Sequence, residues 1–298
     1  IEQKTIINMA HFGRGVFGSD FGTTSFVITN QSISQYKGVY RRLFIKQGAV
    51  DSLETKQKYF FSNMGYFTFK QFDFLKIPGY PIAYWVGKNC ISSFETHKRM
   101  DNYASCKIGI QTGNNELFCR QWSEVNKSDI FGVSGTGVKW FPYTKGGNYR
   151  KWYGNNDLLI DWENHGMRIK NFNSFQTVNE TFWFQECITW GLVSSGAPNF
   201  RFVTDRFHVV GNGGPMANGQ KDNMYLLALL NSAVGSYMCG LLNPTINLST
   251  GVVSKIPVIE SADMRKQVET LSAASISISK YDWDSYETSW DFKRNPLV

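Results

Sequence analysis

WFPYTKGGNYRKWYGNN, residues Trp140–Asn156, places a Gly146-Gly147 pair between two flanks rich in basic and aromatic residues. This pattern predicts a turn at the glycine pair. Lys and Arg side chains contact phosphates, and Arg, Asn and aromatic faces contact bases, so the mixture favours a nucleic-acid surface. A surface hairpin with core-packed aromatic residues and solvated cations is equally compatible with this stretch taken alone.

The composition indicates a globular protein. The chain has 298 residues, enough for one large domain or two ordinary ones, with 42% hydrophobic and 18% charged residues. Aromatic residues make up 15%, which favours sheet-rich structure and flat binding surfaces. The formal net charge of +7 points modestly toward an anionic partner.

Cysteine and histidine usage predicts no metal site. The five cysteines are scattered without a CxxC pair, and the four histidines form no HExxH motif. Free thiols indicate a reducing environment, so we expect a cytoplasmic protein. The longest apolar runs are too short for a membrane span, and no signal peptide opens the sequence. Because the chain starts at Ile1 instead of methionine, we expect it to be a fragment.

The N-terminal part predicts a short helix followed by two strands. Phe21–Asn30 and Val39–Lys46 are β-rich runs that flank a polar turn, so we expect them to form a hairpin at the edge of a larger sheet. Ile77–Trp85 carries two prolines around a glycine and predicts a turn that leads into a helix ending near Met100. We expect the domain boundary at this turn.

The middle of the chain is predominantly β. Ser134–Gly137 lacks both the phosphate-binding pattern GxxxxGK[ST] and a following helix, which favours a plain turn. Ile108–Arg120 predicts a strand, a Gly-Asn turn and a second strand. Further strands are expected at Leu158–Trp162, within Thr181–Val193 and within Pro198–Val210.

The last part of the chain is mainly helical. Met224–Leu242 has apolar residues at helical spacing and predicts one helix, capped by Asn223 or Asp222. A strand-like segment covers Thr245–Val258, and a second helix fills Ala262–Lys280 before a polar tail. Together these elements predict the α+β class, with a β-rich middle and packing helices.

Five blocks in one order resemble a known family. They are GIQTGNNELFCRQWSEV (109–125), WFPYTKGGNYRKWYGN (140–155), ITWGLVSSG (188–196), LLALLNSAVGSYMCGLLNPTIN (226–247) and DWDSYETSW (282–290). Together they resemble the C-terminal half, the target recognition region, of the PglX-type adenine-specific DNA methyltransferases of BREX phage-defence systems. Large methylases of restriction–modification systems share parts of the same pattern.

The resemblance implies a domain organisation. Residues 1–75 would be the C-terminal remnant of a methyltransferase catalytic domain, and their β-hairpin would close its Rossmann-like sheet. Residues 76–100 would form a helical linker, 101–260 the β-rich DNA target recognition domain, and 261–298 a helical, polar C-terminal tail.

The family's catalytic motifs are missing from this sequence, so we predict no catalytic residue and no methyl transfer by this chain alone. Amino-methylation of adenine requires a flipped base, and the family holds it with an Asn/Asp-Pro-Pro-aromatic loop. Asn243-Pro244-Thr245 and Asn295-Pro296-Leu297 lack the second proline and the aromatic residue, and no FxGxG run is present. The resemblance implies S-adenosylmethionine as the cofactor of a complete enzyme, but none for this fragment.

The candidate DNA-binding residues lie in two of the five blocks. Asn and Gln can pair bidentately with adenine and Arg with guanine, whereas Lys contacts phosphates and glycine lets the backbone approach DNA. For Asn114-Asn115 and Gly146-Gly147 a simple role in turns stays open. The candidates are Gln111, Thr112, Asn114, Asn115, Lys145, Gly146, Gly147, Asn148, Arg150 and Lys151.

The expected partners follow from the same assignment. They are double-stranded DNA, the N-terminal methyltransferase domain of the same chain, and other defence-system proteins or a phage DNA-mimic inhibitor. The acidic block Asp282–Trp290 should avoid DNA and dock on another domain or on a partner protein. Two alternatives are a protein-interaction scaffold in a defence complex and a carbohydrate-binding β-module, suggested only by the tryptophan content. Binding to phosphates would weaken steeply with salt, and stacking on sugars would not.

Overall fold

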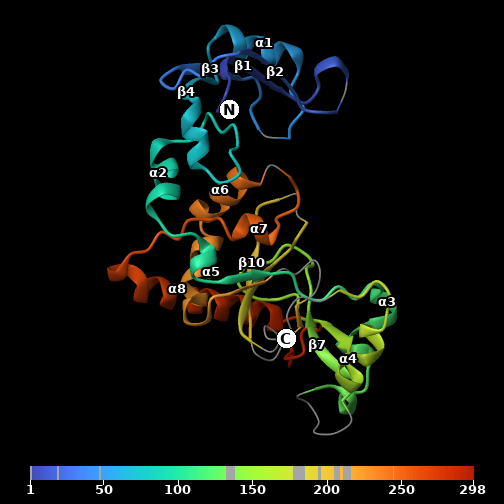
Figure 1. Ribbon diagram of the computed structural model, residues 1–298. Helices are drawn as coiled ribbons and strands as arrows, with labels where there is room; N and C mark the ends of the chain where they lie inside the picture. The colour runs from blue at the N-terminus through green and yellow to red at the C-terminus, as the bar shows by residue number, and fades with distance from the viewer. Residues whose placement is uncertain are drawn as a thin grey trace. The chain divides into compact units, whose positions relative to one another are not determined.

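The computed structural model describes residues 2–18, 20–46, 48–131, 138–176, 185–193, 196–204, 209–210, 216–243 and 245–298. The chain divides into two compact units, Ile1–Thr96 and His97–Val298 (Figure 1). Both contain helices and small sheets, so the α+β class is confirmed. Within the described residues, no single helix has the length and apolar character that a membrane span needs.

The first unit is built on a four-stranded sheet with the order β2-β1-β3-β4. Strand β1 pairs antiparallel with β2 and parallel with β3, and β4 pairs antiparallel with β3. The helices and strands of this unit are β1 (Thr5–Gly13), β2 (Thr23–Thr29), β3 (Lys37–Arg42), α1 (Leu53–Phe61), β4 (Tyr66–Lys70) and α2 (Lys88–Thr96).

Two expectations for this unit are wrong. The N-terminal segment is the strand β1 instead of a short helix, and its first three residues, Thr5-Ile6-Ile7, are all β-branched. The two segments expected to form a hairpin are indeed strands, but β1 lies between them and they do not pair with each other. Local alternation identifies a strand, whereas its neighbour in a sheet depends on residues distant in sequence.

Aromatic residues form the centre of the core of this unit. Tyr40 on β3 stacks on Tyr84 with ring centroids 5.0 Å apart, and burial raises the pKa of each phenol to about 12. Phe74 and Ile77 are fully buried. Because Ile77 and Tyr84 bury their side chains here, much of the segment expected to be a linker is packed in the first unit. Helix α2 ends at Thr96, short of the expected Met100.

The second unit contains two four-stranded sheets with the orders β10-β9-β12-β5 and β11-β7-β8-β6. The strands are β5 (Ser105–Lys107), β6 (Cys119–Gln121), β7 (Trp140–Thr144), β8 (Leu158–Asp161), β9 (Cys187–Trp190), β10 (Phe200–Val203), β11 (Val209–Val210) and β12 (Met216–Asn218). The helices are α3 (Asn115–Phe118), α4 (Glu163–Lys170), α5 (Asn223–Asn231), α6 (Ala233–Leu242), α7 (Thr250–Val253) and α8 (Ala262–Asp284). Short 3-10 turns connect several of them.

The sheet β10-β9-β12-β5 buries one face against helices. Trp190 and Phe200 are opposite each other on β9 and β10 and pack with Leu226 and Leu230 of α5 in the largest core cluster of the described residues. Helix α8 packs against α5 (Figure 1). The strands expected at Leu158–Trp162, within Thr181–Val193 and within Pro198–Val210 are present as β8, β9 and β10, over shorter spans.

The single helix expected over Met224–Leu242 is two helices, α5 and α6, whose axes differ by 78°. Ser232 stands between them in an extended conformation, and its hydroxyl accepts a hydrogen bond from the backbone N–H of Gly235 at 3.0 Å. Side-chain capping starts a new helix at this point, which apolar periodicity alone does not reveal. Neither Asn223 nor Asp222 caps α5 with its side chain.

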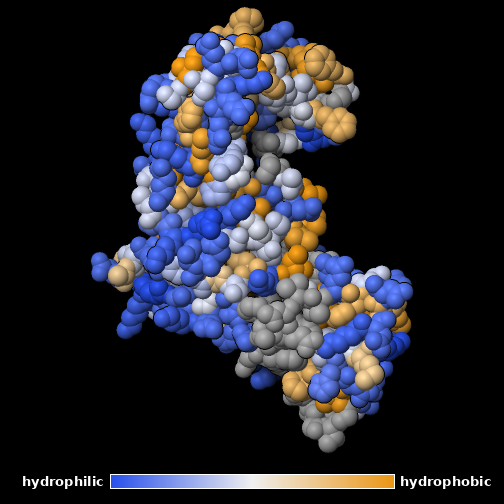
Figure 2. All heavy atoms as spheres, viewed as in Figure 1, coloured by the Kyte–Doolittle hydropathy of each residue, from blue (hydrophilic) through white to orange (hydrophobic). Residues whose placement is uncertain are grey.

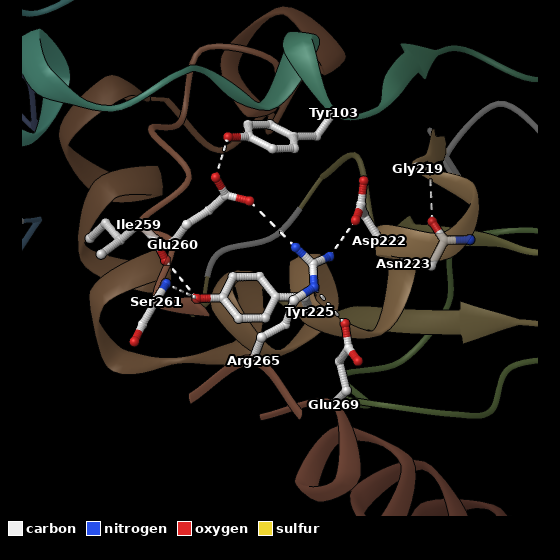
Figure 3. Close-up of polar contacts among 10 residues, drawn as sticks. All are labelled: Tyr103, Gly219, Asp222, Asn223, Tyr225, Ile259, Glu260, Ser261, Arg265 and Glu269. Atoms are coloured by element: carbon white, nitrogen blue, oxygen red, sulfur yellow. Dashed lines mark hydrogen bonds and ion pairs between the residues drawn. The ribbon is translucent and has the colours of Figure 1, made fainter. Parts of the chain in front are cut away.

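Arg265 joins the start of α8 to the rest of the second unit (Figure 3). Its guanidinium lies over the ring of Tyr225 with its central carbon 5.1 Å from the ring centroid. Tyr103 donates a hydrogen bond to Glu260 at 2.8 Å, and burial together with this bond raises the pKa of Tyr103 to about 12. The guanidinium forms ion pairs with three carboxylates from different segments, those of Asp222, Glu260 and Glu269.

The C-terminal part also differs from expectation. The strand-like segment Thr245–Val258 contains the short helix α7, and α8 continues one turn beyond the expected Lys280. The acidic tail docks within its own unit, where the indole N–H of Trp122 donates to the carbonyl of Thr288 at 2.9 Å.

Candidate nucleic-acid interface

The segment between β7 and β8 connects the two sheets of the second unit. Its first flank is β7, which pairs antiparallel with β8, so the hairpin exists but its connection spans residues 145–157. The second flank does not pair with the first. Instead, the backbone of Trp152 exchanges two hydrogen bonds, both 2.8 Å, with Phe200 and Phe202 of β10. The two flanks of the glycine pair therefore do not form a hairpin with each other, which was one of the two alternatives for this stretch.

Gly147 lies where this connection folds over itself. Its φ of +126° lies in the region that favours glycine, and a β-carbon there would be 2.9 Å from the amide nitrogen of Asn155. That same nitrogen donates to the carbonyl of Asn148 at 2.8 Å. Gly146 and Gly147 thus shape a compact loop, and Gly147 is exposed on it.

Two hollows adjoin at Lys145, and we call them together the Lys145 site. The larger, of about 620 Å³, is lined by Lys145, Gly146, Gly147, Asn148, Asn155, Asp157, Leu158, Gly191, Leu192, Val193, Trp283 and Thr288. The smaller, of about 220 Å³, is lined by Gln111, Thr112, Gly113, Asn115, Tyr143, Lys145 and Ser174. The site therefore combines one cation, several amide side chains and exposed loop backbone.

Lys145 is half-buried where the hollows meet. Among the described residues it has no hydrogen-bond or ion-pair partner. Burial raises the pKa of the Cys119 thiol to about 11, and the positive charge of Lys145 offsets part of that increase. An ammonium without a carboxylate partner can bind an external anion without first breaking an internal ion pair.

The smaller hollow is held by backbone pairing and a short helix. Gln111 exchanges two backbone hydrogen bonds with Gln176, at 2.7 and 3.0 Å. The hydroxyl of Thr112 donates to the side-chain oxygen of Asn115 at 2.7 Å. Asn114 caps α3 by accepting from the N–H of Leu117 at 3.1 Å, so it serves the helix and does not line the hollow.

Residues 115–118 were expected to pass from a turn into a strand and instead form α3. The side chain of Asn114 explains the difference, because an N-cap satisfies a free backbone N–H of the first helical turn. The left-handed backbone conformation of this turn is adopted by Gly113, with a φ of +73°, and not by Asn114 or Asn115.

Arg150 and Lys151 stand outside the Lys145 site. Arg150 forms an ion pair with Asp282 and lies over the ring of Trp283 at 5.1 Å. Lys151 donates to the carbonyl of Asn231 at 3.0 Å. These two cations are therefore occupied in attaching the connection to α8 and α5.

Sequence analysis missed two polar residues. Asp157 is half-buried in the larger hollow, and burial raises the pKa of its carboxyl. Arg201 on β10 is fully buried, and within the described residues none of its guanidinium nitrogens has a hydrogen-bond partner. Burial and the nearby charge of Arg150 lower the pKa of Arg201 to about 10. A charged residue between Phe200 and Phe202 was the available signal for Arg201.

No metal centre is evident in the part of the chain that the structure describes, since no three His, Cys, Asp or Glu side chains are grouped to hold an ion. The glycine-rich stretch Ser134–Gly137, expected to be a plain turn, lies outside the described residues.

Comparisons with known proteins place this geometry in context. No family model matches the chain. It is 37% identical over 317 aligned positions to the adenine-specific methyltransferase PglX of Lacticaseibacillus casei (strain Zhang), an alignment that covers 98% of this chain and 26% of that protein. It is 36% identical over 308 positions to the adenine-specific methyltransferase BrxX of Escherichia coli O9:H4 (strain HS), covering 100% of this chain and 24% of the relative.

The chain thus spans about a quarter of the length of the curated relatives it matches. Two relatives align over nearly all of it, so the five ordered blocks belong to one continuous homologous region. The chain is a homologue, over its whole length, of part of the PglX-type adenine-specific methyltransferases, as the sequence blocks predicted.

Proposed function

We propose that this chain is the part of an adenine-N6 DNA methyltransferase that recognises the target sequence in double-stranded DNA. The observation that carries the proposal is the ammonium of Lys145, which has no partner among the described residues and lies between two hollows lined by amide side chains. The relatives named adenine-specific methyltransferases and the net charge of +7 support it.

The Lys145 site offers both kinds of contact that sequence-specific binding needs. Lys145 would meet a phosphate, and the exposed backbone of Gly147 would permit close approach of the DNA. Amide side chains of Gln111, Asn115 and Asn148 carry donors and acceptors suited to base edges, adenine above all. In this proposal Asn114, Arg150 and Lys151 position the loops and do not contact bases.

The remaining chemistry belongs to the longer protein in this proposal. Residues 1–75, within the first unit, would complete the catalytic domain, and residues 101–260 would recognise DNA. S-adenosylmethionine and the flipped adenine would be bound by a methyltransferase domain preceding this region. The setting would be cytoplasmic, in a BREX phage-defence or restriction–modification system.

A protein-interaction surface is the second candidate function. The first unit exposes large apolar side chains, among them Phe17 at 89%, Phe21 at 80% and Phe26 at 60% exposure. Figure 2 shows hydrophobic residues among hydrophilic ones on the surface of this unit. Exposed apolar groups of this kind favour contact with another protein or domain.

The test is selection of the whole chain against a randomised duplex library, followed by binding of the enriched duplex across a salt series. An enriched motif whose affinity falls steeply with salt supports the proposal. Lys145→Gln should reduce the slope of log K against log salt by about 0.9, the effect of one phosphate contact. Lys266→Gln, at an exposed position on α8, is the matched control and should leave the slope unchanged.

Absence of salt-dependent binding, together with stable capture of a protein partner by the first unit, would overturn the proposal in favour of an interaction surface.

A further inference from the structure

Asp157 is the carboxylate of the larger hollow of the Lys145 site, at the residue before β8. Its backbone carbonyl accepts a hydrogen bond from the N–H of Trp122 at 3.0 Å, which fixes the position of the residue. The carboxylate itself has no hydrogen-bond or ion-pair partner on any other described residue. Most of its acceptor positions therefore remain available in the hollow.

The surroundings of Asp157 suit a flat, polar ligand. Trp283 and Leu192 line the hollow with apolar surface, and Asn148 and Asn155 line it with amide groups. Lys145 contributes a positive charge but lies beyond ion-pair distance from Asp157, since the two are not joined in an ion pair. Lys145 and Asp157 are separate charges of opposite sign in one hollow. They favour a ligand that has an anion or acceptor for Lys145 and a hydrogen-bond donor for Asp157.

A structural role does not explain the carboxylate. The contact with Trp122 uses the backbone of Asp157, and no helix in the described residues begins at this position. Metal binding is not favoured either, because Asp157 is the one acidic side chain in the described lining of the hollow. Half-burying a carboxylate without an external partner is unfavourable, and groups held this way are concentrated at functional sites.

We propose that Asp157 determines base specificity by accepting a hydrogen bond from the exocyclic amino group of a DNA base, N4 of cytosine or N6 of adenine. This inference rests on the proposed function and names one contact within it. An ionised carboxylate only accepts hydrogen bonds. Cytosine and adenine present an amino donor in the major groove, whereas thymine O4 and guanine O6 are acceptors that a carboxylate repels.

The experiment uses the whole chain and the motif that it selects from a randomised duplex library. At one position of that motif, replacing cytosine or adenine by an analogue without the exocyclic amino group should weaken wild-type binding about tenfold. In Asp157→Asn the amide can both donate and accept, so this position should tolerate thymine or guanine, and the preference for an amino-bearing base should fall.

Two further variants isolate the effect. Asp263→Asn, at an exposed position on α8, changes the net charge of the chain by the same amount as Asp157→Asn. It should keep the wild-type base preference. Asp157→Glu keeps the carboxylate and should keep the preference for an amino-bearing base, even if its affinity is lower. Thermal unfolding of each variant checks that the fold is intact.

The outcomes separate this inference from the proposed function. An unchanged base preference at every position in Asp157→Asn would overturn the role of Asp157 and leave DNA recognition standing. Salt-dependent binding without any base preference would also overturn the inference while retaining phosphate contact. Absence of DNA binding by the wild-type chain would overturn both.

Discussion

Arg150 and Asp282 form an ion pair across 132 positions of sequence, joining the connection between β7 and β8 to the last turn of α8. Trp283 lies under the same guanidinium. Arg150 is the one arginine among the candidate DNA-binding residues, yet its guanidinium is paired with a carboxylate of the same chain. The pair joins the acidic C-terminal block to the basic, aromatic stretch Trp140–Asn156.

Arg150→Met should lower the free energy of unfolding by about 1–2 kcal/mol, combining a partly exposed ion pair with the cation–π contact. The side chain of Arg150 is 24% exposed and that of Asp282 57%, so solvent weakens the ion pair itself. Urea unfolding would measure the loss, and Asp282→Asn should cost less because it retains the contact with Trp283. A selected DNA motif should survive Arg150→Met. A lost motif at unchanged stability would instead place Arg150 among the base contacts.

Arg201→Met should raise the free energy of unfolding at pH 7. The pKa of Arg201 is lowered to about 10 from 12.5. At pH 7 the guanidinium is charged in both the folded and the unfolded chain. The full free-energy cost of burying that charge is therefore present at pH 7, and it diminishes only as the pH rises above 10. Removing the charge should therefore increase the free energy of unfolding by about 3 kcal/mol, since one pKa unit corresponds to about 1.36 kcal/mol.

Chemical unfolding would measure this gain, with Arg294→Met at an exposed position as the control. A loss of stability in Arg201→Met would show that the guanidinium is stabilised in the folded chain after all.

Gly235→Ala and Gly240→Ala should have opposite effects within α6. A β-carbon at Gly235 would overlap the carbonyl oxygen of Leu229, a contact that the bend between α5 and α6 creates. At Gly240 nothing lies within 4 Å. The first substitution should destabilise by about 2 kcal/mol or more, and the second should stabilise by about 0.5–1 kcal/mol through helix propensity. Thermal unfolding of both variants tests the bend, and equal effects would contradict it.

Acidification should weaken the first unit through His11. Burial and the charge of Arg42 lower the pKa of His11 below 6.5, and its Nδ1 lies 3.1 Å from the hydroxyl of Tyr84. Below pH 6.5 the unfolded chain therefore binds a proton that the folded chain does not, so the free energy of unfolding falls as the pH drops from 6.5 toward the lowered pKa.

Amide hydrogen exchange of β1 and β3 at pH 7 and pH 5.5, corrected for intrinsic exchange, would follow this change. His11→Gln should flatten the pH dependence, and His97→Gln, outside the first unit, should not. An equally steep dependence in His11→Gln would assign the effect to other groups.

The sequence by itself determined the features that depend on local pattern. Runs of strand-favouring residues located β2 and β8, and helical spacing located α8 within four residues of its end. The five ordered blocks identified the homologous region. Local signals suffice for these because a strand face or a helix stripe recurs within a few residues.

Only the tertiary structure decided which segments meet. It inserted β1 between two strands expected to pair, and it matched Arg150 with Asp282 and Lys151 with the carbonyl of Asn231. It also left Lys145 and Asp157 in one hollow without partners on other residues of the described part of the chain. Whether a charge is neutralised or available depends on groups brought near it by packing, and in this chain those groups lie up to 132 positions away.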